Sequence, residues 1–302
     1  MQLPAFAAQP DVEVLILGAG WTSTFLIPLC VERRVSYAAT SRPSHPKPET
    51  VPFHFDEHAA HPDRGAFAAL PSARTVLVTF PIVAPGAATR LVRLYEETHP
   101  GAAPRFVQLG SSGIWELQPG QDSVWLDRHS PYKTHDARAA AEQELLALSP
   151  GTPTTVLNLS GLYGGPRAMK HVVGRVAPTK EALRRSGSIH MIHGIDVARV
   201  ILAVHSNFAL AAGQRWLLTN NRVYDWWDIA ATWGTEFATL KGQAPSPHAR
   251  GERGLQPQWA RELMREERVR ALPRSPEQLG RALDSRDFWD TFGLEPLILQ
   301  LD

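Results

Sequence analysis

Residues 15–26 read LILGAGWTSTFL, and this stretch decides the fold class. Its first residues end a short apolar run over residues 12–17, which is typical of a buried strand. Two glycines, Gly18 and Gly20, follow at once, and apolar residues then recur at helical spacing up to residue 34. The pattern predicts a strand, a tight turn and a helix, in that order.

A turn of this kind can hold a dinucleotide. Its first glycine permits the tight turn, its second lets the backbone approach a pyrophosphate, and the helix that follows offers free N–H groups. Gly18 and Gly20 occupy these positions, and Ser23 stands where a third glycine is usual but a small residue can serve. We therefore predict that Gly18, Gly20, Trp21, Thr22 and Ser23 bind the cofactor. A turn that only packs is the alternative.

Strands and helices alternate along the first two thirds of the chain. We predict further strands at 35–39, 51–55, 74–80, 105–109, 154–158 and 215–219, and helices at 22–34, 85–99, 130–148 and 196–205. Parallel neighbours need helical crossovers, so this alternation predicts an α/β, doubly wound parallel sheet.

The pattern loosens after residue 165. Beyond the last predicted strand we expect helices only, at 224–237, 258–269 and 276–283, followed by a short turn over 284–292. We therefore expect a dinucleotide-binding domain over 1–165, with 190–222 returning to its sheet, and a smaller, mostly helical substrate lobe over 166–302.

Composition limits the class of partner. Lys and Arg number 31 against 30 for Asp and Glu, and a net charge of +1 argues against a nucleic-acid or anionic-membrane surface. No apolar run approaches the roughly 20 residues that a membrane helix needs, and the first ten residues lack the features of a signal peptide. The single cysteine, Cys30, suits a reducing compartment. We expect a cytoplasmic protein with a small-molecule substrate.

The second strand indicates which dinucleotide is bound. An NAD site has an acidic residue about 20 residues after the glycines, but residues 39–42 read ATSR. Ser41 and Arg42 suit a 2′-phosphate, because arginine forms bidentate bonds to such an oxyanion. We favour NADP, with NAD as the alternative and Arg42 as a solvated loop residue as the competing interpretation. We expect Asp56, at the end of the third strand, near the adenine. Thr79, Phe80 and Pro81 are expected to line the ribose.

Three histidines have the spacing of one helical face. His54, His58 and His61 could in principle bind zinc. However, His54 falls within a predicted strand, and a proline follows His61. We therefore predict no metal site.

Four motifs between residues 111 and 204 carry a family resemblance. They are SSGIW at 111–115, AAAEQELL at 139–146, TVLNLSGLYGGPR at 155–167 and IHMIHGIDVARVILAV at 189–204. In this order they resemble the extended short-chain dehydrogenase/reductase proteins. More narrowly, they are similar to the atypical NAD(P)-binding members grouped with the nucleoside-sugar epimerases and dehydratases. The resemblance covers residues 12 to 235 approximately and implies a Rossmann fold.

The resemblance implies hydride chemistry by a Ser or Thr together with a Tyr-x-x-x-Lys pair. A lysine one helical turn after the tyrosine lowers the pKa of the phenol, which can then pass a proton near neutral pH. Here Tyr132 is followed four places later by Asp136, whose charge has the wrong sign. If Glu142 is instead matched to the family's glutamate, the pair falls on Thr134 and Arg138. In either alignment the pair is not intact.

Several catalytic roles stay open. Ser111 matches the family's serine and is expected to bind a substrate oxygen. Tyr132 or Lys133 could supply a proton from a shifted frame, and Arg138 could hold the ribose or a substrate anion, although guanidinium is a poor acid. His193 is a further candidate, since histidine titrates near neutrality.

These observations give three competing functions. The first is an NADP-dependent oxidoreductase, epimerase or dehydratase acting on a small carbonyl or hydroxyl compound. The second is a catalytically degenerate NADP(H) sensor that reports to a protein partner. The third is a non-redox isomerase or lyase that reuses the cleft. The resemblance also implies a homodimer formed through the helices after the fourth and fifth strands.

Overall fold

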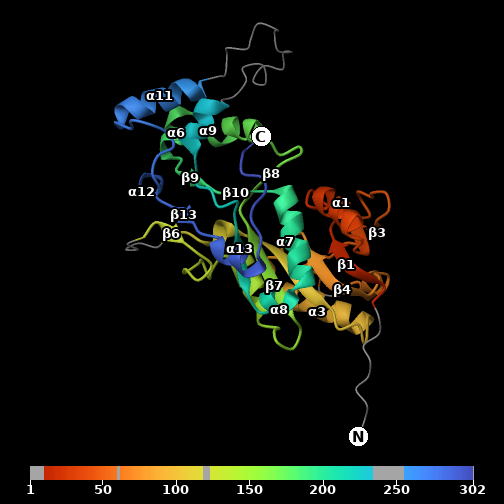
Figure 1. Cartoon of the computed structure of the whole chain (residues 1–302). Helices are drawn as coiled ribbons and strands as arrows, with labels where there is room; N and C mark the ends of the chain where they lie inside the picture. The colour runs from red at the N-terminus through yellow and green to blue at the C-terminus, as the bar shows by residue number, and fades with distance from the viewer. Residues whose placement is uncertain (1–9, 60–61, 118–122, 234–254, 302) are drawn as a thin grey trace.

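The computed structural model describes residues 10–59, 62–117, 123–233 and 255–301. A seven-stranded parallel sheet lies between helices, and a smaller lobe lies beyond it (Figure 1). The α/β, doubly wound class is therefore confirmed. The strands of the sheet are β1 (Val12–Leu17), β2 (Tyr37–Ser41), β3 (Val51–Pro52), β4 (Ala73–Val78), β5 (Arg105–Ser111), β7 (Thr154–Leu159) and β11 (Arg215–Leu218).

The order of the strands places a crevice beside β1. Across the sheet the order is β3-β2-β1-β4-β5-β7-β11, and every neighbouring pair is parallel. The chain moves from β1 to one edge and then returns to the other side of β1. In open α/β sheets ligands bind at the carboxyl ends of the strands where this reversal occurs.

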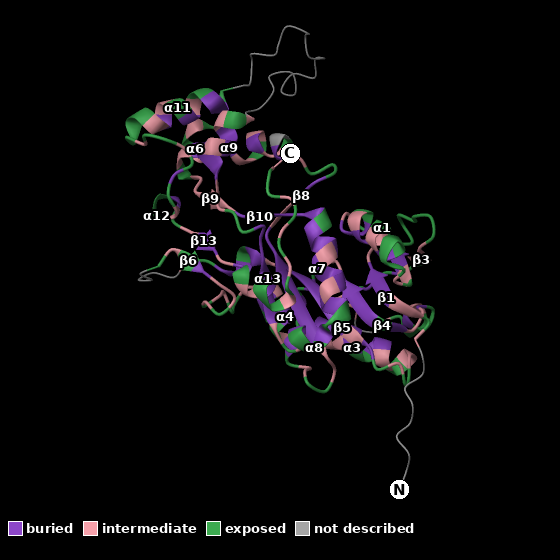
Figure 2. Ribbon diagram, viewed as in Figure 1, coloured by how far each residue is buried: buried purple, intermediate pink, exposed green. Residues whose placement is uncertain are grey.

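Both faces of the sheet are covered. Along β1, Val14 and Ile16 enter one apolar cluster while Leu15 and Leu17 enter the other, as the alternation of side chains along a strand requires. The strands are accordingly buried almost throughout (Figure 2). The first cluster is covered by α1 (Ser23–Arg33), α7 (Gly194–Ser206), α8 (Phe208–Ala211) and α13 (Arg286–Phe292), and the second by α2 (Arg64–Ala68), α3 (Ala87–Thr98) and α4 (Ala137–Leu146).

The lobe has an apolar cluster of its own. Four helices contribute to it: α5 (Val173–Val176), α6 (Lys180–Arg185), α9 (Trp226–Thr232) and α11 (Gln256–Glu266). Two pairs of short strands border it, namely β8 (Gly161–Tyr163) with β10 (Met191–His193), and β9 (Ser188–Ile189) with β12 (Tyr224–Asp225). A third pair, β6 (Trp125–Leu126) with β13 (Ala282–Leu283), belongs to a separate small apolar cluster. The helix α12 (Pro276–Leu279) precedes β13. The expectation of helices only after the last sheet strand is therefore wrong.

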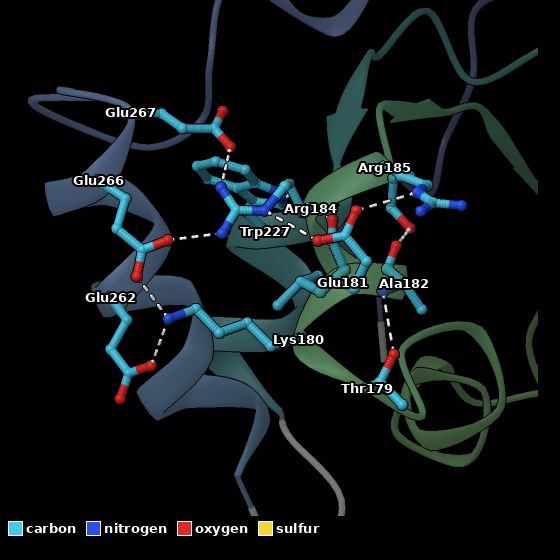
Figure 3. Close-up of polar contacts among 12 residues, drawn as sticks. Thr179, Lys180, Glu181, Ala182, Arg184, Arg185, Trp227, Glu262, Glu266 and Glu267 are labelled. Carbon is cyan, nitrogen blue, oxygen red and sulfur yellow. Dashed lines mark hydrogen bonds and ion pairs between the residues drawn. The ribbon is translucent and has the colours of Figure 1, made fainter.

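Ion pairs join two helices of the lobe (Figure 3). Lys180 Nζ on α6 lies 2.6 Å from carboxylate oxygens of both Glu262 and Glu266 on α11. The guanidinium of Arg184 lies 2.5 Å from Glu266 and 2.8 Å from Glu267. One turn of α6 is thereby fastened to the last turn of α11.

Other boundaries differ from the prediction for identifiable reasons. The helix predicted from residue 130 begins only at Ala137, because the Asp136 carboxylate accepts the N–H groups of Arg138 (2.9 Å) and Ala139 (3.0 Å) and so caps it. The third strand ends at Pro52, so Asp56 does not end it.

The end of the chain also differs from the prediction. Residues 284–292, expected as a turn, contain α13. Phe288 of this helix packs edge-on against Trp216 of β11, with ring centroids 5.5 Å apart. The last segment of the chain therefore returns to the core of the sheet. The helix predicted over 224–237 is seen as α9, and its part from residue 234 lies outside the described residues. Within the described ranges every helix is too short or too polar to span a membrane.

Candidate functional site

A cavity of about 810 Å³ opens at the carboxyl ends of β1, β2 and β4, where the strand order reverses. The turn after β1, the loop after β2 and the residues after β3 and β4 form most of its wall. It is lined by Gly18, Ala19, Gly20, Trp21, Thr22, Thr40, Ser41, Arg42, His45, Lys47, Phe53, His54, Phe55, Asp56, Glu57, His58, Thr79, Phe80, Pro81, Leu162 and Arg167. Every predicted cofactor residue except Ser23, which is buried at the start of α1, is in this lining.

Gly18 is a glycine because the fold requires one. Its φ is +96°, a conformation that side chains rarely allow, and a Cβ there would lie 2.7 Å from Thr79 Oγ1. The turn is held from both sides, since the Gly18 N–H donates to Thr40 Oγ1 (2.9 Å) and Thr79 Oγ1 donates to the Gly18 carbonyl oxygen (2.7 Å). Thr40 within β2 and Thr79 directly after β4 therefore fix the first half of the turn.

Gly20 is different, because nothing in the fold requires a glycine there. Its φ lies outside the left-handed region, and the nearest atom to an added Cβ would be the Gly18 carbonyl oxygen at 3.9 Å. A methyl group at this position would instead occupy the cavity that the residue lines. The space beside Gly20 suits the close approach of a ligand to the backbone.

Two main-chain donors of the turn are free. The N–H groups of residues 18–20 are all used, donating to Thr40 Oγ1, the Thr40 carbonyl oxygen and the Gly18 carbonyl oxygen. Among the hydrogen bonds of the described residues, none takes the N–H of Trp21 or Thr22. Both residues line the cavity at the amino end of α1, where N–H groups and the helix dipole favour an anion.

Three basic residues from the segment after β2 also line the cavity. Arg42 follows β2 and is exposed, and His45 and Lys47 line the same part of the cavity. Lys47 Nζ donates to the Ala19 carbonyl oxygen, which ties the loop after β2 to the glycine turn. The sequence interpretation missed His45 and Lys47, although two basic residues so soon after Arg42 were a visible signal.

The hydroxyl of Ser41 forms hydrogen bonds within the loop after β2. Its hydroxyl lies 2.7 Å from Thr50 Oγ1 and accepts the Lys47 N–H at 3.1 Å, which closes the loop after β2. On the far wall Phe55 stacks against Phe80 at a centroid distance of 6.4 Å. Aromatic faces beside a polar rim suit a flat heterocycle.

The residues proposed for catalysis lie outside this lining. Ser111 ends β5, and its Oγ accepts the Gly113 N–H at 3.2 Å. The Tyr132 hydroxyl donates to Gln143 Oε1 at 3.1 Å, and the Lys133 ammonium pairs with Glu116. Tyr132 and Lys133 precede α4, so neither is placed by helical spacing against a residue four places on.

Arg138 faces inward from α4. Its Nη2 donates to the Leu109 carbonyl oxygen at 2.9 Å, and its Nε lies 3.5 Å from the buried carboxylate of Glu142. Glu142 also pairs with Arg215 and accepts Asn158 Nδ2 at 2.8 Å. Arg138 therefore belongs to a polar cluster beneath the end of β5.

His193 is buried behind the turn that follows β8. Its Nδ1 accepts the Ile195 N–H at 3.2 Å and so caps α7, and its ring contacts Phe25 and Tyr163 edge-on. A Cβ on Gly164 would lie 2.2 Å from His193 Nε2. The structure thus gives His193 a packing role, while the predicted catalytic roles of all five residues stay predictions.

Metal ligands were not expected, and two of the three histidines considered can be placed. His54 and His58 line the cavity, whereas His61 lies outside the described residues. Within the described ranges no group of three or more His, Cys, Asp or Glu side chains is arranged to hold a metal ion.

Similarity to known proteins is found by structure and not by sequence. No protein-family model matches the sequence, and no curated protein matches it by sequence. Solved structures match over nearly the whole chain. A protein described as an NAD-dependent epimerase/dehydratase from Methylobacillus flagellatus is 18% identical, with a TM-score of 0.61, over 95% of this chain and 93% of that one.

Two further matches have similar scores. Yeast methylglyoxal/isovaleraldehyde reductase, solved in complex with NADPH, is 16% identical with a TM-score of 0.58 over 95% of this chain and 94% of that one. A UDP-galactose 4-epimerase is 15% identical with a TM-score of 0.58 and the same coverage of 95% and 94%. At these identities the likeness establishes a shared Rossmann-type fold.

Proposed function

We propose that the chain binds NADP(H) in the cavity beside β1 and acts as an NADP-dependent oxidoreductase, epimerase or dehydratase on a small carbonyl or hydroxyl compound. One observation carries the binding. Gly20 lines the cavity with room for a Cβ and an ordinary backbone conformation, so a ligand, and not the fold, accounts for the glycine.

The residues present fit this dinucleotide. The free N–H groups of Trp21 and Thr22 suit the diphosphate. Arg42, directly after β2, suits a 2′-phosphate. Asp56 and the Phe55–Phe80 pair suit the adenosine. The NADPH held by the yeast reductase of the same fold supports the proposal.

The chemistry depends on a proton donor. The coenzyme supplies or accepts the hydride when it is bound. In this chain Ser111 presents a hydroxyl at the end of β5, where it can orient a substrate oxygen. The single O–H of Tyr132 is donated to Gln143, so a proton transfer by Tyr132 requires that this bond break first. Lys133 is paired with Glu116 and would have to use another of its three ammonium N–H groups.

The bonds of Tyr132 to Gln143 and of Lys133 to Glu116 favour a second candidate function, an NADP(H) sensor without turnover. Steady consumption of NADPH with any member of a broad carbonyl panel would exclude a pure sensor. A Tyr132→Phe variant that retains this turnover would show that the proton comes from another group.

Calorimetry with NADPH and NADH tests the proposed binding. We expect Arg42→Ala to weaken NADPH by about tenfold or more, because a charged bond to phosphate is lost, and to leave NADH unchanged. Gly20→Ala should weaken both coenzymes, since its methyl group enters the space of the diphosphate. No heat with either coenzyme for the wild-type chain would overturn the proposal, and an equal loss of both in Arg42→Ala would overturn the 2′-phosphate role.

A further inference from the structure

Trp21 connects the glycine turn to a segment far along the chain. Its Nε1 donates to the Gly164 carbonyl oxygen at 3.1 Å. Gly164 and Arg167 pair with each other, N–H to carbonyl in both directions, at 3.1 and 3.3 Å. The tight turn after β8 is therefore docked on the residue that follows Gly20.

This docking places a cation at the cavity. The Arg167 guanidinium lies over the Trp21 ring, 4.6 Å from its centroid, while Phe25 contacts the same ring edge-on at 4.9 Å. Arg167 lines the cavity, and no carboxylate of a described residue forms an ion pair with it. Stacking holds the guanidinium plane but leaves its N–H edge free.

We infer that Arg167 is a second binding residue for the diphosphate of the coenzyme, an inference that rests on the proposed function. Its guanidinium is stacked on the ring of Trp21, and the main-chain N–H of Trp21 is one of the two free donors of the glycine turn. A phosphate at those donors would lie beside Trp21, and the guanidinium stacked on that ring is a planar, bidentate cation with which no carboxylate of a described residue forms an ion pair. Arg42 stands instead directly after β2, where the adenosine ribose lies in this fold, and the ammonium of Lys47 is bonded to the Ala19 carbonyl oxygen.

The inference has a structural consequence. The diphosphate would bridge the turn after β1 and the turn after β8, two segments that the Trp21–Gly164 hydrogen bond and the stacked arginine already join. Coenzyme binding would then tighten the contact between the first turn and the strand pair β8–β10, which leads into the lobe.

The test compares three ligands with two variants. Arg167→Met keeps an unbranched side chain on Trp21 but removes the charge, and Arg185→Met on α6, whose side chain is 79% exposed, is the matched control. Calorimetry would use NADPH, NADH and 2′-AMP, which has the 2′-phosphate but no diphosphate. We expect Arg167→Met to weaken NADPH and NADH alike, by about tenfold or more, and 2′-AMP to bind as before. Arg185→Met should bind all three as the wild type does.

The outcomes separate the two proposals. If wild-type protein binds NADPH and Arg167→Met binds it equally well, the inference about Arg167 fails and the proposed function stands. If Arg167→Met loses NADPH and 2′-AMP together but keeps NADH, Arg167 belongs to the 2′-phosphate and the inference also fails. If the wild-type chain binds neither coenzyme, the proposed function itself fails. Circular dichroism of each variant establishes that it is folded.

Discussion

Gly18 and Gly20 are glycines for different physical reasons, although only Ala19 lies between them. Gly18 has a left-handed backbone and lies against Thr79, whereas Gly20 has an ordinary backbone and open space. The first serves the turn itself, and the second keeps the cavity open. A sequence pattern alone cannot distinguish these two roles.

Two alanine variants distinguish these roles. Gly18→Ala should lower the free energy of unfolding by about 1–3 kcal/mol, because a left-handed non-glycine residue and a contact inside van der Waals distance both cost energy. The free energy of unfolding of Gly20→Ala should differ from that of the wild type by no more than about 0.5 kcal/mol. Urea denaturation measures both. Equal stability of Gly18→Ala and the wild type would contradict this account of the turn.

At the scale of elements, the start of α4 changes how its neighbours must be interpreted. Asp136 caps the helix, so Tyr132 and Lys133 lie in the preceding segment. The concern that Asp136 opposes Tyr132 across one helical turn therefore disappears. In its place stand two observed contacts, Tyr132 with Gln143 and Lys133 with Glu116.

Ion pairs at the protein surface join α6 to the end of α11. The pKa of Arg184 is raised by its bonds to Glu266 and Glu267, and the pKa of Glu266 is lowered by its bonds to Lys180 and Arg184. These groups are partly or fully open to solvent, so salt screens their attraction. We expect Arg184→Met to lower the melting temperature slightly at low salt and by less in about 1 M NaCl. If the melting temperature of Arg184→Met is lower than that of the wild type by the same amount at both salt concentrations, the variant has lost packing and not an ion pair.

At the scale of the whole molecule, His190 connects the β9–β10 segment to β13. Its Nε2 accepts the Leu283 N–H at 2.9 Å. Burial, aided by the positive charge of Arg281, lowers the pKa of His190 from 6.5 to about 3. The ring is therefore neutral in the folded chain, as its role as an acceptor requires.

This contact predicts a loss of stability in mild acid. The unfolded chain takes up the His190 proton below pH 6.5 while the folded chain does not, so the stabilisation present above pH 6.5 is lost as pH falls. Between pH 7 and pH 5 the loss is about 2 kcal/mol for this group. His190→Gln retains an acceptor that cannot titrate. Its free energy of unfolding should therefore fall less steeply with pH than that of the wild type, and parallel curves would refute the assignment.

Much of the cavity could be predicted from short stretches of sequence. Gly18, Thr79 and Arg42 each follow a strand, and the carboxyl ends of neighbouring parallel strands meet at one edge of the sheet. The limits of short strands and the start of α4 were harder to predict, because a single cap or a loop hydrogen bond decides them.

The sequence by itself determined the order of the strands in the large sheet and of the helices between them, the doubly wound class and the turn beside β1, because apolar periodicity and glycine placement act over a few residues. Only the tertiary structure decided that Arg167 stacks on Trp21, that α13 returns to Trp216 and that the predicted catalytic side chains lie away from the cavity. These contacts join residues far apart in the chain. They depend on how whole elements pack, and no local pattern records that packing.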